Sequence, residues 1–137
     1  IQNMWKSNLN VDITIKIDEY PLVIQYLLEN NYDIGSIAWN ADYNDPMTML
    51  EIMFTGNSFN YGTFSNPKYD KLVLNARKTS DNVLRMNYMI DAEKILMDEM
   101  PLIPICHRAF TLMLNPKLKG IVYNPLGKHK FNYCYIE

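Results

Sequence analysis

The sequence contains little of the chemistry that most often indicates an enzyme. Its 137 residues include two histidines, two cysteines and five glycines. The chain has no Gly-x-Ser-x-Gly nucleophile element and no paired acid and base residues in a pattern typical of catalysis. An enzyme is therefore the least expected class of protein.

A long apolar run and a basic cluster are also absent. No apolar stretch approaches the roughly 20 residues that a membrane-spanning helix needs. The chain carries thirteen basic and fifteen acidic residues, whereas a nucleic-acid site needs clustered lysine and arginine. The residues that are present, 48% hydrophobic and 20% charged, are typical of a globular domain with one core. We expect no nucleic-acid partner for this segment.

The histidines and cysteines lie in the C-terminal third of the chain. Cys106 precedes His107, and His129 lies near Cys134. A metal site can be imagined from these pairs, but their spacing matches none of the usual zinc patterns. A disulfide between the cysteines would require neighbouring strands with α-carbons within bridging distance. Asp42 together with His107 could suggest hydrolysis, although no nucleophile motif supports it. We expect no metal and no cofactor.

The first forty residues have the pattern of a β-α-β unit. Residues 11–17 alternate apolar and polar side chains, which predicts a strand with one buried face. Asp18 or Glu19 offers a capping oxygen for a helix whose first turn holds Pro21. Residues 34–39 then predict a short buried strand. A crossover of this length favours parallel pairing of the two strands, so the second would end at the carboxyl edge of the sheet.

Two longer helices are predicted further along the chain. Asn66 before Pro67 is a strong helix start, and an apolar stripe follows it at helical spacing: Tyr69, Leu72, Val73 and Ala76. Ser80 or Asp81 caps the next helix, over residues 82–99. Its predicted core face is rich in methionine, a side chain that fills irregular gaps: Met86, Met89, Ile90, Leu96, Met97 and Met100.

The chain becomes β-rich after this helix. Pro101 and Pro104 stop helix formation. The apolar residues that are then available for strands are Ile103, Ile105, Phe110, Leu112 and Leu114. Asn115-Pro116 and Asn124-Pro125 predict the breaks between these strands.

Residues 38–46 place a carboxylate, Asp42, among aromatic and amide side chains. That chemistry suits a cation. Asp45-Pro46 predicts a helix start, because proline at the first helical position loses no hydrogen bond. Asp42 therefore lies at a strand-to-helix corner, where open α/β sheets bind ligands. A turn or capping role for Asp42 is the alternative.

Four stretches of the chain, taken in order, resemble one known family. The first is the Trp-x-Ala-Asp-Tyr-x-[Asp/Glu]-Pro element of residues 39–46. The others are Asn60-Tyr61 with 65–72, 92–96 with 100–105, and Lys119-Gly120 with Asn124-Pro125 and Gly127. The ordered set is similar to the oligopeptide- and dipeptide-binding proteins of peptide ABC transporters, in extracellular solute-binding protein family 5.

The resemblance implies an architecture. Members of this family are much longer and fold as two lobes around a cleft, so the chain, which begins at Ile1, is expected to be a C-terminal fragment. The implied fold class is α/β: a β-α-β unit with helices packed on a mostly parallel mixed sheet, followed by a β-rich C-terminal tail, within a two-lobed periplasmic-binding-protein-like fold. Residues 1–104 would form the C-terminal part of one ligand-binding lobe. Residues 105–137 would be a β-rich return segment that crosses to the other lobe.

The resemblance also implies a function, extracytoplasmic oligopeptide binding for uptake by an ABC transporter. Asp42 takes the place of the acidic residue that pairs with the α-ammonium of the ligand, in a cleft between the lobes. Trp39 borders the ligand backbone, and Asn40 and Ala41 belong to the same ligand-binding stretch.

The expected partners are a peptide and, through the intact protein, the membrane permease subunits of the transporter; the isolated fragment could also self-associate. The expected location is the periplasm or the surface of a bacterium, there as a lipoprotein. The same scaffold also leaves open nickel complexes, haem or oligosaccharide as ligands, or a role as the ligand-sensing domain of a transcriptional regulator.

Overall fold

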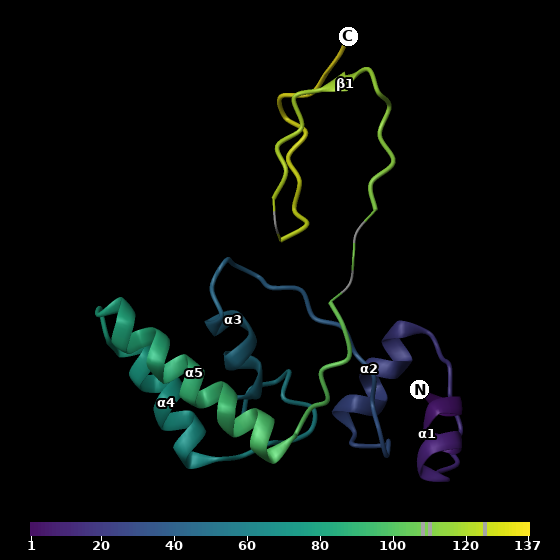
Figure 1. Ribbon diagram of the computed structural model, residues 1–137, viewed down its shortest axis with the longest axis vertical. Helices are drawn as coiled ribbons and strands as arrows, with labels where there is room; N and C mark the ends of the chain where they lie inside the picture. Colours follow the sequence, from purple (N-terminus) through teal and green to yellow (C-terminus); the bar gives the residue numbers. More distant parts are fainter. Residues whose placement is uncertain (108, 110, 125) are drawn as a thin grey trace. The chain divides into compact units, whose positions relative to one another are not determined.

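The computed structural model describes residues 1–107, 109, 111–124 and 126–137. These residues form two compact units, residues 1–36 and residues 37–137 (Figure 1). Among the described residues, no helix combines the length and the apolarity that crossing a membrane requires.

The first unit contains two short helices. Helix α1 spans Gln2–Leu9, and helix α2 spans Tyr20–Leu28. Pro21 lies in the first turn of α2, as the sequence predicts, because its missing N–H would have no partner there. The predicted side-chain cap is wrong: Glu19 occupies the N-cap position, and its side chain makes no capping hydrogen bond.

The predicted β-α-β unit is not present in the described structure. Residues 11–17 and 34–39 contain no strand. Most of their apolar side chains are open to solvent, with Ile15 58% and Ile17 86% exposed. Alternating apolar residues indicate which face of a strand can be buried. A strand forms only when a neighbour also satisfies its backbone N–H and C=O groups. Trp39 therefore does not end a strand at the edge of a parallel sheet.

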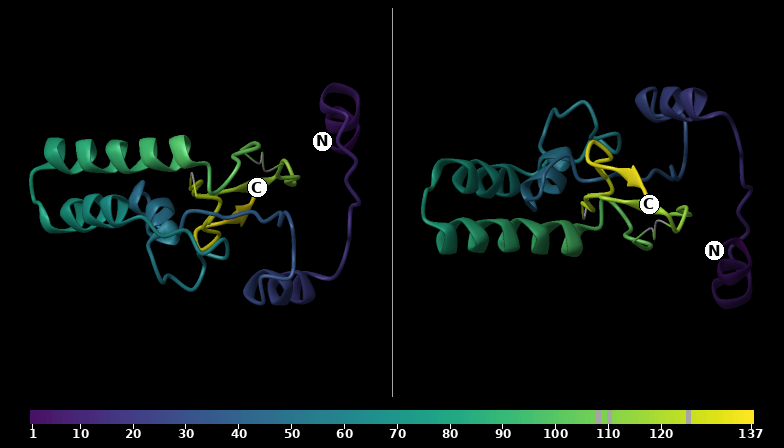
Figure 2. Two further views of the ribbon diagram at one scale, coloured as in Figure 1. Left: turned by 90° about the horizontal axis from the view of Figure 1, so that it is seen from below. Right: turned by 90° about the horizontal axis from the view of Figure 1, so that it is seen from above.

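The second unit is built around four helical elements. Helix α3, Met47–Leu50, is followed at once by the 3-10 helix η1, Glu51–Met53. Helices α4, Pro67–Lys78, and α5, Asn82–Glu99, lie side by side as a hairpin (Figures 1 and 2). Their facing sides and the short helices enclose one core: Met47, Leu50, Met53, Phe64, Tyr69, Val73, Ala76, Met89, Ala92 and Leu96.

Local capping signals explain where the two long helices begin. Asn66 Oδ1 accepts the N–H groups of Lys68 and Tyr69 over 2.9 and 3.0 Å. Asp81 Oδ1 likewise accepts two N–H groups in the first turn of α5 over 2.9 and 3.0 Å. Each cap satisfies donors that have no partner within the helix. Both predicted helix starts are confirmed.

The predicted core stripe is confirmed on α4 and only partly correct on α5. Tyr69, Val73 and Ala76 are fully buried. On α5 the buried residues are Met89, Ala92 and Leu96, whereas four residues of the predicted face are exposed: Met86, Ile90, Met97 and Met100. The buried row follows the i, i+3, i+7 positions of one helix face, and the exposed methionines lie outside it.

The C-terminal part of the second unit contains a small antiparallel sheet. Strand β1, Leu118–Lys119, pairs with β2, Tyr135–Ile136, and Val122 forms a bridge with Lys130. Gly120, next to β1, has a φ of +80°, which glycine adopts readily. A Cβ at this position would lie 2.1 Å from the Tyr133 carbonyl oxygen, so only glycine fits here. Residues 102–107, 109 and 111–114 form no strand. The predictions that involve Phe110 and Pro125 lie outside the described residues.

Candidate ligand-binding site

Residues 38–46 form an irregular corner that leads into α3 (Figure 1). The four predicted site residues are consecutive here. Asn40 and Asp42 are exposed, and Trp39 and Ala41 are half-buried. These four residues therefore offer one carboxylate, one amide and main-chain groups to solvent, with the indole ring partly covered.

The N–H and one carboxylate oxygen of Asp42 are both held by the side chain of Thr48 in α3. The Asp42 N–H donates a hydrogen bond to Thr48 Oγ1 over 3.1 Å. The same hydroxyl lies 3.5 Å from Asp42 Oδ2, at the long end of the hydrogen-bonding range, and donates toward it. Both contacts bind the backbone and one carboxylate oxygen of Asp42 to the start of α3.

The start of α3 is fixed in turn by Asp45. Its Oδ1 accepts the Met47 N–H over 2.9 Å. Arg85, in α5, donates a fork of two hydrogen bonds to the same carboxylate, over 2.7 Å to Oδ2 and 2.8 Å to Oδ1. The Arg85 hydrogen bonds, with a smaller contribution from Met47, hold the pKa of the Asp45 carboxyl below its usual value, although burial opposes them. The corner and α5 are thus joined by a bidentate charge pair.

Aromatic rings lie beside the corner. The Trp39 and Phe59 rings meet edge to face with centroids 4.7 Å apart, and Phe59 packs on Tyr61 at 6.5 Å. Such pairs stabilise packing beyond the area that they bury. Trp39 Nε1 is buried and has no hydrogen-bond partner among the described residues. Trp39 therefore packs as part of an aromatic row while keeping one unused donor.

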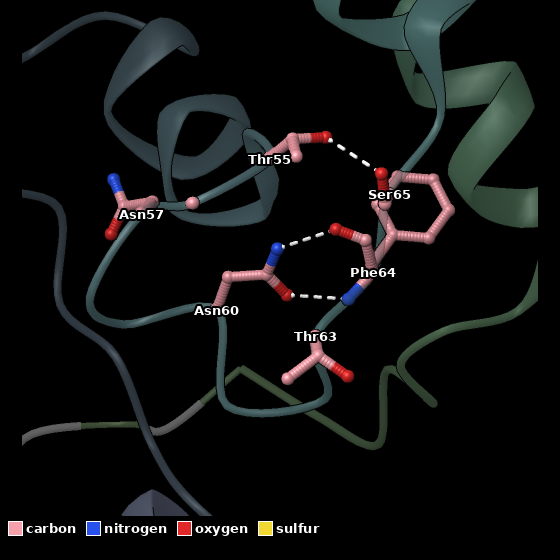
Figure 3. Close-up of a pocket in the computed structure, with 7 residues that line it drawn as sticks. Thr55, Asn57, Asn60, Thr63, Phe64 and Ser65 are labelled. Carbon is pink, nitrogen blue, oxygen red and sulfur yellow. Dashed lines mark hydrogen bonds between the residues drawn. The ribbon is translucent and has the colours of Figure 1, made fainter.

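The loop between η1 and α4 borders an open hollow of about 280 Å³ (Figure 3). The side chain of Asn60 stabilises this loop through two hydrogen bonds. Its amide group donates to the Phe64 carbonyl oxygen over 2.7 Å, and its amide oxygen accepts the Phe64 N–H over 3.0 Å. Figure 3 shows the amide of Asn60 turned toward Phe64 and the Thr55 hydroxyl turned toward Ser65. The buried amide has its hydrogen bonds met within the loop, so its role here is structural. The lining residues are Thr55, Gly56, Asn57, Asn60, Thr63, Phe64 and Ser65.

The basic side chain of Lys128 reaches the corner from the C-terminal part of the same unit. Lys128 Nζ donates to the Asp42 carbonyl oxygen over 3.2 Å. It contacts the main chain of Asp42 and leaves the carboxylate accessible.

The histidine and cysteine pairs do not form a metal site in the described part of the chain. There, no three His, Cys, Asp or Glu side chains are placed to hold one ion. Cys106 and Cys134 are both free thiols rather than a disulfide. His129 Nδ1 instead accepts the Asn124 N–H over 3.1 Å, and its ring packs against Tyr123.

Comparison with known proteins places the chain in a family. No family model matches it. The oligopeptide-binding protein OppA of Bacillus subtilis is 33% identical over 138 aligned positions that cover 100% of this chain. The periplasmic murein peptide-binding protein MppA of Escherichia coli is 35% identical over 125 positions, or 90% of the chain. The chain belongs to the oligopeptide- and dipeptide-binding protein family.

Solved structures of peptide-binding proteins agree with this membership. The Escherichia coli murein tripeptide-binding protein MppA superimposes with a TM-score of 0.90 at 33% identity, covering 98% of this chain and 27% of that one. Haemophilus influenzae OppA in complex with RPPGFSPFR gives a TM-score of 0.82 at 26% identity, over 98% and 27%. The chain spans about a quarter of the length of its curated relatives, 25% of OppA and 23% of MppA. It thus has the fold of one part of a peptide-binding protein, with more helix and less sheet than expected.

Sequence reasoning named the Asp42 corner as the candidate site but did not name the residues that support it. Thr48, Arg85 and Phe59 were all missed. Arg85 lies 40 residues from its partner Asp45, so no local pattern connects them. Asp45 was named with Pro46 as a helix start, and its carboxylate does bind an N–H in the first turn of α3.

Proposed function

We propose that this chain is a segment of the ligand-binding lobe of an oligopeptide receptor that serves an ABC transporter, and that Asp42 binds the α-ammonium of the peptide. The observation that carries the proposal is the placement of Asp42. Its carboxylate is exposed and hydrogen-bonded through one oxygen only among the described residues. This arrangement occurs in a chain homologous to peptide-binding proteins.

A receptor that accepts peptides of many sequences recognises what all peptides share. These common features are the main-chain donors and acceptors and the two charged ends. A carboxylate makes a charge-assisted hydrogen bond to an ammonium group, and such bonds are about twice as strong as neutral ones. Trp39 would border the ligand backbone, and the exposed Asn40 and the main chain of Ala41 would contact it beside the charged end.

The remainder of the proposal concerns the intact receptor. Residues 1–104 would belong to one lobe, and residues 105–137 would return toward the other. Closure of the two lobes would exclude water from the Asp42–ammonium pair and strengthen it. The proposed partners are a peptide and the permease subunits of the transporter, and the proposed location is outside the cytoplasm. Self-association is proposed only for the isolated segment, whose extended residues present apolar side chains to solvent.

The test is an Asp42→Asn substitution in the full-length receptor that carries this segment, with binding measured by calorimetry. Affinity for peptides with a free α-ammonium should fall about a hundredfold or more, because removing one partner of a buried charge pair typically costs about 3–5 kcal/mol. N-acetylated peptides should bind poorly to the unchanged receptor and lose little more. Asp91→Asn, which removes the same charge from an exposed pair with Lys94 on α5, is the matched control and should leave both affinities unchanged.

The alternative role predicts a different pattern. If Asp42 were only a turn residue, the substitution would lower the melting temperature and weaken both classes of peptide alike. Equal losses for free and acetylated peptides would reject Asp42 as the ammonium anchor.

A further inference from the structure

Thr48 is a polar residue whose side chain is buried, so its hydroxyl needs hydrogen-bond partners within the protein. The residue is 5% exposed, and Asn60 is the other buried polar residue in the described structure. A buried hydroxyl without partners is unfavourable, since it loses its hydrogen bonds to water. The side chain of Thr48 meets this requirement with one residue, Asp42, through both its acceptor and its donor.

The position of Thr48 is itself fixed. Its N–H donates to the Asp45 carbonyl oxygen over 3.2 Å. Asp45 is bound by the Arg85 fork on α5, and the α3 neighbours Met47 and Leu50 are in the core. A chain of contacts therefore runs from α5 through Asp45 to the Thr48 hydroxyl. The Thr48 hydroxyl is thus held in place by the start of α3 and the core, and it contacts a corner that has no regular secondary structure.

We propose that Thr48 is the positioning residue of the ligand anchor: its hydroxyl holds the main chain and Oδ2 of Asp42, so that Oδ1 stays directed to the ligand ammonium. This inference rests on the proposed function, since it assigns Thr48 a role toward that anchor. In the part of the chain that the structure describes, Oδ1 of Asp42 has no hydrogen-bond partner. Thr48 thereby sets specificity for a free amino terminus without touching the peptide.

The test compares two substitutions of Thr48 in the full-length receptor. Thr48→Val keeps the shape and removes the hydroxyl, so affinity for free tripeptides should fall about tenfold, while N-acetylated tripeptides should be unaffected. Thr48→Ser keeps the hydroxyl and should restore most of the lost affinity. Thr79→Val, a control at a hydroxyl that accepts the Asp81 N–H, should leave both affinities unchanged.

Asp42→Asn and the double variant complete the design. If Thr48 acts through Asp42, then Thr48→Val should weaken free-peptide binding no further once Asp42 is already Asn. A merely structural role for Thr48 would instead lower the melting temperature, weaken both peptide classes and add to the effect of Asp42→Asn. Discrimination lost in Asp42→Asn but intact in Thr48→Val would overturn the Thr48 assignment alone. An Asp42→Asn receptor that still discriminates would overturn the proposed function and the Thr48 role with it.

Discussion

Residues 47–99 and the extended segments 11–17 and 34–39 are all rich in apolar residues, yet only the first region buries them. In residues 47–99, Tyr69, Val73 and Ala76 are completely covered. In the extended segments, Ile17 is 86% and Ile34 64% exposed. The amount of apolar surface in the sequence therefore does not distinguish the two regions.

The difference lies in where each region finds partners for its backbone. A helix satisfies its own N–H and C=O groups, and it then needs only one apolar face against a neighbour. Helices α4 and α5 pack against each other, and both lie within about thirty residues of chain. An extended segment needs a second strand before its apolar face can be ordered. The residues of the helical region are therefore sufficient to specify its fold, whereas the extended segments need a neighbouring strand to form a sheet.

The largest expected effect comes from removing a side chain at the centre of the helical core, which tests whether residues 47–99 form a core of their own. Tyr69→Ala should lower the free energy of unfolding of the chain by about 3–5 kcal/mol, because the ring is fully buried and would leave a cavity. Lys71→Ala, at an exposed position on the same helix, should change it by less than about 0.5 kcal/mol. Urea denaturation followed by circular dichroism measures both.

Tyr69→Phe, in the same experiment, measures the contribution of the hydroxyl apart from that of the ring. The Tyr69 hydroxyl donates to the Leu50 carbonyl oxygen over 2.6 Å and so ties α4 to α3. Removing it deletes this side-chain hydrogen bond, while the Leu50 carbonyl remains the N-cap acceptor of η1, so the substitution should cost about 0.5–1.5 kcal/mol. A cost for Tyr69→Ala close to that of Lys71→Ala would contradict the claim that residues 47–99 hold their own core.

The second prediction concerns the charge pair between the corner and α5. Asp45→Asn should cost about 1–2 kcal/mol at pH 7. This is the lower part of the range for hydrogen bonds to charged groups, because the Arg85 and Asp45 side chains are still 27% and 26% exposed. Asp91→Asn, at an exposed pair whose lysine and aspartate side chains are 67% and 53% exposed, is the control and should cost less than about 0.5 kcal/mol.

The pH dependence of this cost has a definite sign. The folded-state pKa of Asp45 is lowered, chiefly by Arg85. Its stabilisation is therefore fully present above the unfolded-state pKa of about 4 and is lost as the pH falls through the folded value. The stability difference between wild type and Asp45→Asn should be constant from pH 6 to 8 and shrink below about pH 4. A difference that stays constant down to pH 2 would exclude the charge pair as its cause.

The parts of the structure that sequence predicted are those with local causes. Asn66 and Asp81 start their helices because their side chains cap groups two and three residues away. The Tyr69 stripe follows from helical spacing alone. The Arg85–Asp45 pair could not be predicted, because the two charges are distant in sequence and either could have stayed solvated.

The extended segments show the opposite limit. The alternation in residues 11–17 was real, but it indicates only which side chains can share a face. It carries no information on which chain segment lies alongside. The same limit applies to the candidate site: the residue types around Asp42 indicated a cation, while the hydroxyl that holds it depends on the three-dimensional path of the corner.

The smallest expected effect tests the extended side of the comparison. Ile17→Ala in the isolated chain should change the free energy of unfolding by less than about 0.5 kcal/mol, since an 86% exposed side chain has little burial to lose. In the full-length receptor, the same substitution should cost about 2–5 kcal/mol if the segment is covered there by a neighbouring strand, as for other buried isoleucines. Thr14→Ala, at an exposed polar position of the same segment, is the control for loss of side-chain bulk without loss of a buried apolar contact. A large cost for Ile17→Ala in the isolated chain would mean that residues 11–17 already pack within it, and the distinction between the two regions would disappear. An equally small cost in the isolated chain and in the full-length receptor would show that the apolar face of residues 11–17 is covered in neither protein.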